Sequence, residues 1–279
     1  MKSLKEIGIP TKKQTFIIAE IGINHGGDID LAKKLIDSAV RTGVDAVKFQ
    51  TYLTEKRVTK DSPIFDILKK CELSFEAFRE LKQYCDSKGV LFFSTPFDSE
   101  SVDFLESLNV QLYKLASFDV VNFEILKKVA STGKPVIISV GMSSISEIKN
   151  AVEELNKGTS QIGLLHCISA YPTSEEDANV SAIHSLIVNF PDCVVGQSDH
   201  TNDIQVPLYA VAAGAQILEK HYKVSENMEC IDAPVSISES QMAKLVTETR
   251  RLEKILGNGI PESTPVQKGT EQYRRFKNY

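Results

Sequence analysis

Two hydrophobic patterns alternate along the chain. Short runs of apolar and β-branched residues are separated by longer segments in which apolar positions recur every three to four residues. The short runs show little internal alternation with polar residues, which is typical of strands buried on both faces of a parallel sheet. We therefore predict eight strands, at residues 16–22, 46–50, 91–95, 112–116, 135–139, 162–166, 193–198 and 217–221.

The longer segments predict amphipathic helices. Residues 30–43 place Leu31, Leu35 and Ala39 on one stripe and end at Gly43, a residue typical of helix C-termini. We expect the other helices at 74–89, 99–108, 123–133, 144–158, 179–190, 204–214 and 238–257. Strict alternation of eight strands with eight helices predicts a single-domain (β/α)8 TIM barrel, with a doubly wound open sheet as the alternative.

The barrel should occupy residues 1–256, with a short N-terminal cap, and a tail or linker rich in Gly, Pro, Ser and Thr should follow at 257–279. The net charge of −5 and the pI near 5.7 do not suit a nucleic-acid partner. No apolar run is long enough to span a membrane, and no secretory signal opens the chain. Five cysteines without C-x-x-C spacing argue against a disulfide framework or a thiolate zinc site. We expect a cytoplasmic protein with reduced thiols.

Polar residues gather at the C-terminal ends of the predicted strands, where the active sites of TIM barrels lie. Four of the five histidines are at this end, and His184 falls inside a helix, so we interpret it as structural. The strand-end candidates are Glu20, His25, Lys48, Gln50, Thr95, Lys114, Ser117, Ser139, His166, Tyr171, Ser198, Asp199, His200, Glu219, Lys220 and His221.

Lys48 and Lys114 lie inside otherwise apolar strands, where an ammonium is costly unless an anion accompanies it. One interpretation is an internal ion pair with Glu20 or Glu219. Another is an anion site for phosphate or carboxylate, completed by the hydroxyls of Ser117, Ser139 and Ser198. A third is a lysine that forms a Schiff base, as in barrel aldolases.

His200 and His221 follow consecutive strands, so their imidazoles can meet at the barrel mouth and bind a divalent metal. Asp199 and Glu219 could orient the histidines or complete the site. A barrel with a metal and two lysines suggests aldol-type chemistry between an anionic carbon nucleophile and a polarised carbonyl.

Eight blocks in order along the chain resemble the N-acetylneuraminate (sialic acid) synthase family, which includes legionaminate and pseudaminate synthases and spore-coat polysaccharide proteins. The match covers nearly the whole chain. The blocks are FIIAEIGINHGGD (16–28), DAVKFQTY (45–52), FFSTPFD (92–98), YKLAS (113–117), SVGM (139–142), LLHCISAYPT (164–173), VGQSDHT (195–201) and EKHY (219–222).

The resemblance implies a condensation of phosphoenolpyruvate with an N-acylated mannosamine-type sugar, which gives a nine-carbon 2-keto-3-deoxy acid and phosphate. It implies a divalent metal, typically Mn²⁺, on His200 and His221, and a homodimer. Lys48, Lys114, Ser139 and Ser198 match residues that hold phosphoenolpyruvate, with Ser117 beside them. Around the sugar and the reacting carbons, the matching positions are Glu20, Gln50, Asp119, Tyr171 and Asp232.

The departures from the family pattern concern the sugar. Asp119 stands where a glutamate is usual, Ser169 where some members have asparagine, and Ala233 where many have histidine; GQSDH replaces the commoner GLSDH. The antifreeze-like domain that usually follows the barrel is not expected within this chain. Because that domain gives an arginine to the sugar site of the neighbouring subunit, we expect weak sugar affinity without it.

Two other functions are compatible with the sequence. One is a related barrel aldolase or keto-deoxy sugar acid synthase with a different aldehyde. The other is a non-catalytic, sugar-binding relative in surface polysaccharide assembly, against which the presence of Glu20, both strand lysines and both strand-end histidines argues.

Overall fold

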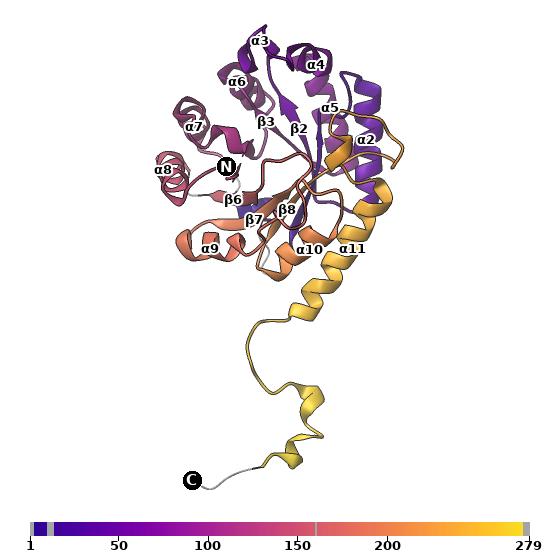
Figure 1. Ribbon diagram of the computed structural model, residues 1–279, viewed down its shortest axis with the longest axis vertical. Coiled ribbons are helices and arrows are strands. Elements are labelled where there is room, and N and C mark those ends of the chain that lie inside the picture. Colours follow the sequence, from indigo (N-terminus) through magenta and orange to yellow (C-terminus); the bar gives the residue numbers. More distant parts are fainter. Residues whose placement is uncertain (1–2, 10–13, 160, 276–279) are drawn as a thin grey trace.

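The computed structural model describes residues 3–9, 14–159 and 161–275 and contains a barrel of eight parallel strands surrounded by helices (Figure 1). The order in the sheet is β3-β2-β1-β8-β7-β6-β5-β4, and β3 lies beside β4, so the sheet nearly closes on itself. The strands are β1 Phe16–Gly22, β2 Ala46–Thr51, β3 Leu91–Pro96, β4 Tyr113–Leu115, β5 Val136–Ser139, β6 Ile162–Cys167, β7 Val194–Asp199 and β8 Ile217–His221. The predicted (β/α)8 TIM barrel is confirmed.

Helices cover the outside of the barrel and begin and end where the sequence signals place them. Asp28 caps the start of α2 by accepting bonds from the next turn, and Gly43 ends it with a positive φ of 81°. The helices are α1 Leu4–Ile7, α2 Ile29–Thr42, α3 Thr54–Arg57, α4 Phe65–Cys71, α5 Phe75–Lys88, α6 Ser99–Ser107, α7 Phe123–Ala130, α8 Ile145–Leu155, α9 Ala182–Asn189, α10 Gln205–Ala212 and α11 Glu239–Leu256.

The barrel interior changes character along its axis. Near the strand N-termini, inward side chains form an apolar cluster, and Leu4 and Ile9 of the N-terminal segment close it from below. The strand members of this cluster are Phe16, Ile18, Ala46, Phe93, Leu112, Ile137, Leu165 and Ile217. Two residues further along several strands, the inward positions become polar, so the same alternation that builds the core also builds a polar layer above it.

The connection from β2 to α5 contains two short helices, α3 and α4, that the sequence patterns did not predict. They lie above the ends of β2 and β3 at the top of Figure 1. A small apolar cluster of Ile23, Tyr52, Leu68 and Cys71 holds this connection against the barrel mouth. The connection therefore adds side chains to the rim that no strand supplies.

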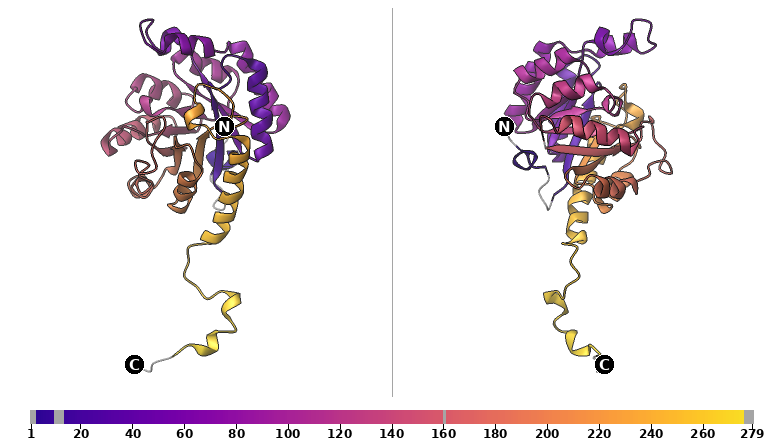
Figure 2. Two further views of the ribbon diagram at one scale, coloured as in Figure 1. Left: turned by 45° about the vertical axis from the view of Figure 1, so that its right-hand side comes forward. Right: turned by 90° about the vertical axis from the view of Figure 1, so that its left-hand side faces the viewer.

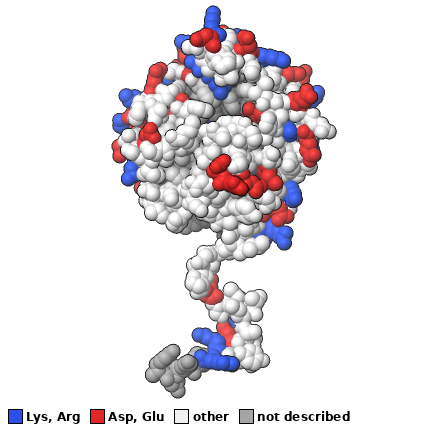
Figure 3. Space-filling view, viewed as in Figure 1, with Lys and Arg blue, Asp and Glu red and all other residues white. Residues whose placement is uncertain are grey.

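Residues 257–275 extend away from the barrel below α11 and are exposed throughout (Figure 2). Charged side chains are spread around the molecule, but the lower left of Figure 3, over α9, is almost free of them. Both α9 and α10 lack charged residues altogether. None of the helices in the described ranges is long and apolar enough to cross a membrane.

Candidate active site

A cavity of about 400 Å³ lies at the C-terminal ends of the strands. Of the residues predicted from the resemblance, all except Asp119 line it, namely Glu20, Lys48, Gln50, Lys114, Ser117, Ser139, Tyr171, Ser198, His200, His221 and Asp232. Glu219 lines it as well. The residues that line this cavity come from all eight strands and from the connections that follow them, as the barrel topology requires.

Strand register sets the order of the central groups. Glu20 is level with Lys48 on one neighbouring strand and with His221 on the other. Gly22, two residues after Glu20, has a φ of 56° and leaves the space between Glu20, Gln50 and Asp232 free of a side chain. A Cβ there would lie 3.1 Å from Glu20 Oε1, 3.2 Å from Gln50 Nε2 and 3.3 Å from Asp232 Oδ2. Glycine is therefore needed for these three groups to converge.

Lys48 is buried and lies between two carboxylates. Its Nζ is 2.9 Å from Glu20 Oε2 and 3.8 Å from Glu219 Oε1, and it donates to Thr95 Oγ1 at 2.9 Å. Burial acts to lower the pKa of Lys48, but the two carboxylates outweigh it and hold the pKa above its usual value. Lys48 is thus a charged ammonium at neutral pH, as the ion-pair interpretation expected.

Lys114 is equally buried but is less well paired. Its Nζ donates to Ser139 Oγ at 2.6 Å and to the carbonyl of Leu115 at 2.8 Å, while its carboxylate neighbour, Glu219 Oε2, is 3.9 Å away. Burial lowers the pKa of Lys114 despite the attraction of Glu219. Two lysines share the carboxylate of Glu219, whose pKa they lower against the effect of burial. An anionic ligand beside Lys114 would supply the missing charge.

The two strand-end histidines face each other across the cavity wall, with ring centroids 5.3 Å apart. His200 Nδ1 lies 2.7 Å from the carbonyl oxygen of Ile168, and His221 Nδ1 lies 3.2 Å from Asp232 Oδ2. Burial and the nearby His221 lower the pKa of His200 to about 3, so it is neutral. Asp232 outweighs burial and raises the pKa of His221. The ring centroids of Tyr171 and His200 are 4.1 Å apart.

This arrangement fits a divalent metal. An oxygen lies near Nδ1 of each imidazole, which is the usual arrangement for a histidine that binds metal through Nε2. No group of three or more His, Cys, Asp or Glu side chains suited to a metal occurs within the described ranges. The protein would therefore supply two nitrogens and leave the other coordination positions to water and substrate.

Asp199 and Lys220 lie on the opposite face of the sheet from the histidines. Lys220 is fully buried, its Nζ is 2.6 Å from Asp199 Oδ2, and it also bonds the carbonyl of Thr201. The expectation that Asp199 serves the histidine pair directly is wrong, because alternation along β7 turns Asp199 outward between Ser198 and His200. Asp232, from the connection after β8, takes the place beside His221.

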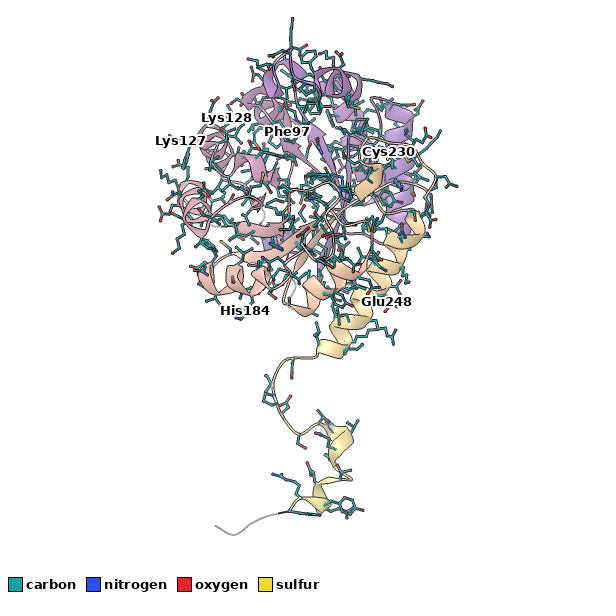
Figure 4. The ribbon with its side chains drawn as sticks, in the orientation of Figure 1. Phe97, Lys127, Lys128, His184, Cys230 and Glu248 are labelled. Atoms are coloured by element: carbon teal, nitrogen blue, oxygen red, sulfur yellow. The ribbon has the colours of Figure 1, made fainter. Side chains whose placement is uncertain are left out.

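Three other histidines do not line the cavity. His166 turns outward and bonds the carbonyl of Ala178 at 2.8 Å. His25 packs against Phe49, with ring centroids 6.0 Å apart, and accepts a bond from the backbone of Gly27. His184 is exposed on the outer side of α9 (Figure 4). It is therefore a surface residue, and the interpretation of His184 as a structural residue is wrong.

Asp119 is buried beside the cavity and accepts a bond from Asn122 Nδ2 at 3.0 Å. Burial raises its pKa. Ser169 is not among the residues that line the cavity, and its Oγ would be 2.6 Å from a Cβ added at Gly141. The roles that the resemblance gives these positions stay predictions.

Several residues that line the cavity were not expected in it. Phe97, labelled in Figure 4, follows β3, and Arg57 ends α3. The others are Ile23, Ile64, Ala116, Phe118 and Cys167. Most of them lie beyond the strand ends, so a search limited to strand ends did not include them. The connections after the strands were the signal available in the sequence.

Comparison with known proteins gives a consistent set of relatives. The NeuB family model matches residues 35–261. An uncharacterized protein of Methanocaldococcus jannaschii is 48% identical over 257 residues, which cover 91% of this chain and 75% of that protein. The N,N'-diacetyllegionaminic acid synthase of Campylobacter jejuni is 37% identical, with 90% of this chain and 80% of that protein covered.

Solved structures give the same result. An N-acetylneuraminic acid synthetase from Leptospira borgpetersenii, determined in complex with citrate, superposes with a TM-score of 0.93 at 42% identity and covers 95% of this chain and 93% of that one. A truncated 3-deoxy-D-arabino-heptulosonate 7-phosphate synthase from Thermotoga maritima shares the fold alone, at 17% identity and a TM-score of 0.70. The chain therefore belongs to the NeuB family, the family of the sialic acid and legionaminic acid synthases.

Proposed function

We propose that this protein is a nonulosonate synthase that condenses phosphoenolpyruvate with an N-acylated mannosamine-type sugar to give a nine-carbon 2-keto-3-deoxy acid and phosphate. One observation carries the proposal. Two buried lysines that share the carboxylate of Glu219 lie in the same cavity as a pair of histidines whose rings are 5.3 Å apart. Such a cavity combines a site for a small anion with a site for a polarised carbonyl.

Phosphoenolpyruvate would occupy the lysine side of the cavity. Lys114 and Ser139 already contact each other at 2.6 Å, and Ser198 donates to Glu219 at 3.0 Å. The ammonium groups of Lys48 and Lys114, with the hydroxyls of Ser139 and Ser198, would bind the phosphate and carboxylate oxygens. Binding here would bring a negative charge closer to Lys114 than the shared carboxylate of Glu219, which is 3.9 Å away.

The sugar aldehyde would lie on the histidine side. His200 and His221 would hold a divalent cation, Mn²⁺ by the resemblance, which when bound supplies a Lewis acid that polarises a carbonyl oxygen. Asp232 and the carbonyl of Ile168 keep the two imidazoles oriented through their Nδ1 atoms. Tyr171, about half exposed beside both rings, covers the side of this position that faces solvent.

Glu20 would transfer a proton between the two substrates. Its Oε2 is paired with Lys48 at 2.9 Å, and its Oε1 accepts a bond from Gln50 Nε2 at 3.1 Å, so its position is fixed. After C3 of phosphoenolpyruvate attacks C1 of the open-chain sugar, water adds at C2. Glu20 would accept a proton from that water, and the former aldehyde oxygen would take up a proton to become a hydroxyl. The C2–O bond to phosphate then breaks, which leaves a keto group at C2 and releases inorganic phosphate.

The chemistry of Lys114 supports a second candidate, a Schiff-base aldolase. A buried lysine with a lowered pKa inside a cavity is a suitable amine nucleophile. In that case sodium borohydride with the keto substrate would trap a covalent adduct on Lys114, and a chelator would have no effect on activity.

An assay of phosphate release from the purified chain tests the proposal. The assay contains MnCl2, phosphoenolpyruvate and either N-acetylmannosamine or a 2,4-di-N-acetylated mannose analogue. We expect sugar-dependent release of phosphate that EDTA abolishes and Mn²⁺ restores. His200→Asn and His221→Asn should lose the response to metal, whereas His184→Asn, on the exposed side of α9, should keep it. Phosphate release that EDTA leaves unchanged would disprove the metal-assisted reaction.

The proposal also covers the partners. Phosphoenolpyruvate and an N-acyl hexosamine are the expected small molecules, and a non-catalytic sugar-binding protein would bind the sugar but release no phosphate from phosphoenolpyruvate. The homodimer expected from the resemblance stays a prediction that sedimentation analysis of the purified chain tests.

A further inference from the structure

Arg57 is a cavity residue to which neither the sequence nor the proposed reaction gave a role. It is the last residue of α3, in the connection after β2. Its guanidinium lies over the ring of Phe97, with Cζ 3.6 Å from the centroid, and it also contacts the ring of Tyr52, at 4.7 Å. Stacking on two rings fixes the plane of the guanidinium and leaves its edge free to donate hydrogen bonds.

Within the described residues, only one hydrogen bond from this edge to a protein acceptor is found. Arg57 NH1 donates to Gln50 Oε1 at 3.1 Å, and the described residues provide no carboxylate within ion-pair distance of it. A guanidinium has five N–H donors, so four are left for the cavity or its solvent. The bond to Gln50 continues to Glu20, since Gln50 Nε2 donates to Glu20 Oε1 at 3.1 Å. Arg57 is therefore held at the outer end of a chain of contacts that begins at the reaction centre.

The charges around Arg57 argue against an anionic ligand. Burial lowers its pKa, and the carboxylates of Asp232, Asp119 and Glu20 act at longer range to offset that effect. Although Glu20 is also paired with Lys48 and Asp232 lies beside His221, three carboxylates near one guanidinium leave little surplus of positive charge at this end of the cavity. A phosphate at this place would be repelled by those carboxylates, whereas a neutral acceptor would not.

Apolar side chains also line the cavity that Arg57 reaches. Ile64, Phe97 and Phe118 line the same cavity, and Phe118 is 63% exposed although its ring is large. A ligand group that has both a hydrogen-bond acceptor and a methyl group fits such a combination, because the methyl covers apolar area that is otherwise in contact with water.

We propose that Arg57 binds the N-acyl group of an uncharged, unphosphorylated sugar. The guanidinium donates to the acyl carbonyl oxygen, and the acyl methyl contacts the apolar side chains beside it. This inference rests on the proposed function and narrows its second substrate to a neutral N-acylated hexose. Arg57 is then the residue that distinguishes an N-acylated sugar from the parent hexose.

Assays that vary both residue 57 and the sugar substrate test the inference. Wild type, Arg57→Met and Arg57→Lys are assayed for phosphate release with N-acetylmannosamine, with mannose and with N-acetylmannosamine 6-phosphate. Arg79→Met is the matched control, because Arg79 also lies over a ring, that of Phe104 at 5.7 Å, but outside the cavity. Thermal unfolding of each variant shows whether the fold is kept.

We expect Arg57→Met to lower kcat/KM for N-acetylmannosamine by roughly 10- to 100-fold, the loss of a hydrogen bond from a charged donor. The KM for phosphoenolpyruvate and the activity with mannose should change by less than about threefold, since neither uses the acyl contact. Arg57→Lys should fall between wild type and Arg57→Met, because it keeps the charge without the planar edge. Arg79→Met should behave as wild type.

Two results would overturn the inference. The first is an equal loss with mannose and with N-acetylmannosamine in Arg57→Met. The second is a wild-type preference for the 6-phosphate that Arg57→Met abolishes, which would make Arg57 an anion site. If no sugar supports phosphate release, the proposed reaction is wrong. Calorimetric binding of N-acetylmannosamine to wild type and Arg57→Met then decides the role of Arg57, and equal affinities would refute it.

Discussion

Three lysines are buried in the barrel strands, and they lie on opposite faces of the sheet. Lys48 and Lys114 face the cavity, whereas Lys220 faces the layer between the sheet and the helices. Lys220 has a carboxylate at 2.6 Å, but Lys114 is 3.9 Å from its carboxylate and shares it with Lys48. Lys48, on the cavity side, has Glu20 at 2.9 Å, so of these three lysines only Lys114 lacks a carboxylate in close contact.

This difference separates a residue that supports the fold from a residue available for a ligand. A buried ion pair with close geometry contributes little net free energy but is costly to break, since one charge is then left alone. A buried ammonium without a close carboxylate is destabilising until a ligand supplies the charge. Burial of a lysine in a strand does not distinguish these cases; the distance to the nearest carboxylate does.

The largest effect is expected from Lys220→Met, which leaves Asp199 buried without its cation. We expect a loss of about 3–5 kcal/mol in the free energy of unfolding, measured by urea denaturation. The double variant Lys220→Met/Asp199→Leu should recover most of it, because both charges are then gone. Lys56→Met, which removes an exposed pair with Glu100 at 3.0 Å, is the control and should change stability by less than about 1 kcal/mol. If Lys220→Met were as stable as this control, Lys220 would have no structural role.

Lys114→Met should give the next largest effect, but on ligand binding. We expect the KM for phosphoenolpyruvate to rise by roughly 30-fold or more, because a buried charge contact with the substrate is lost. The loss of stability should be smaller than for Lys220→Met, since Glu219 keeps Lys48 and Ser198 as partners. Calorimetric titration with phosphoenolpyruvate and urea denaturation separate the two effects. An unchanged KM would place the anion elsewhere.

Burial also distinguishes the histidines, and it predicts a smaller effect, a dependence of the free energy of unfolding on pH. Burial lowers the pKa of His25 to about 4 in the folded protein, against about 6.5 in the unfolded chain. The unfolded state therefore binds more protons between these values, so this contribution to stability is complete above about pH 6.5 and is lost as pH falls toward 4. We expect His25 to account for about 2 kcal/mol of lost stability at pH 5.

The measurement is urea denaturation in EDTA at pH 7 and pH 5. His25→Asn should reduce the acid-induced loss, whereas the control His184→Asn, exposed on α9, should not. Identical pH dependence in wild type and His25→Asn would mean that His25 does not titrate abnormally.

The strands could be predicted because each is a run of apolar residues, and the barrel followed from their number and spacing. Of the candidate site, the residues at inward-facing strand ends could be predicted from the sequence. Alternation along each strand decides which of the polar strand-end residues face the cavity. Since Glu219 and His221 face inward, Lys220 must face outward, and the same rule removes Asp199 and His166 from the cavity.

Other parts could not be derived from local pattern. The helices α3 and α4 are only four and seven residues long, too short to show a period, and apolar contacts with the barrel mouth hold them. Arg57 lies in the cavity only because this connection folds back over it. The place of Asp119 outside the cavity lining depends on the turn at Ser117–Asp119 after β4, which the strand pattern does not specify.

The pairing of β1 with β8 has a consequence for the synthesis of the protein on the ribosome. Residues Phe16–Glu20 bond to Ile217–His221, so one edge of β1 stays open until about 200 further residues have been made. At cellular translation rates this interval is roughly 10–40 s. Throughout it, an apolar strand edge is exposed to other nascent chains. Formation of the final β1–β8 pair thus closes the barrel and ends the period in which the chain is most exposed to aggregation and to chaperones.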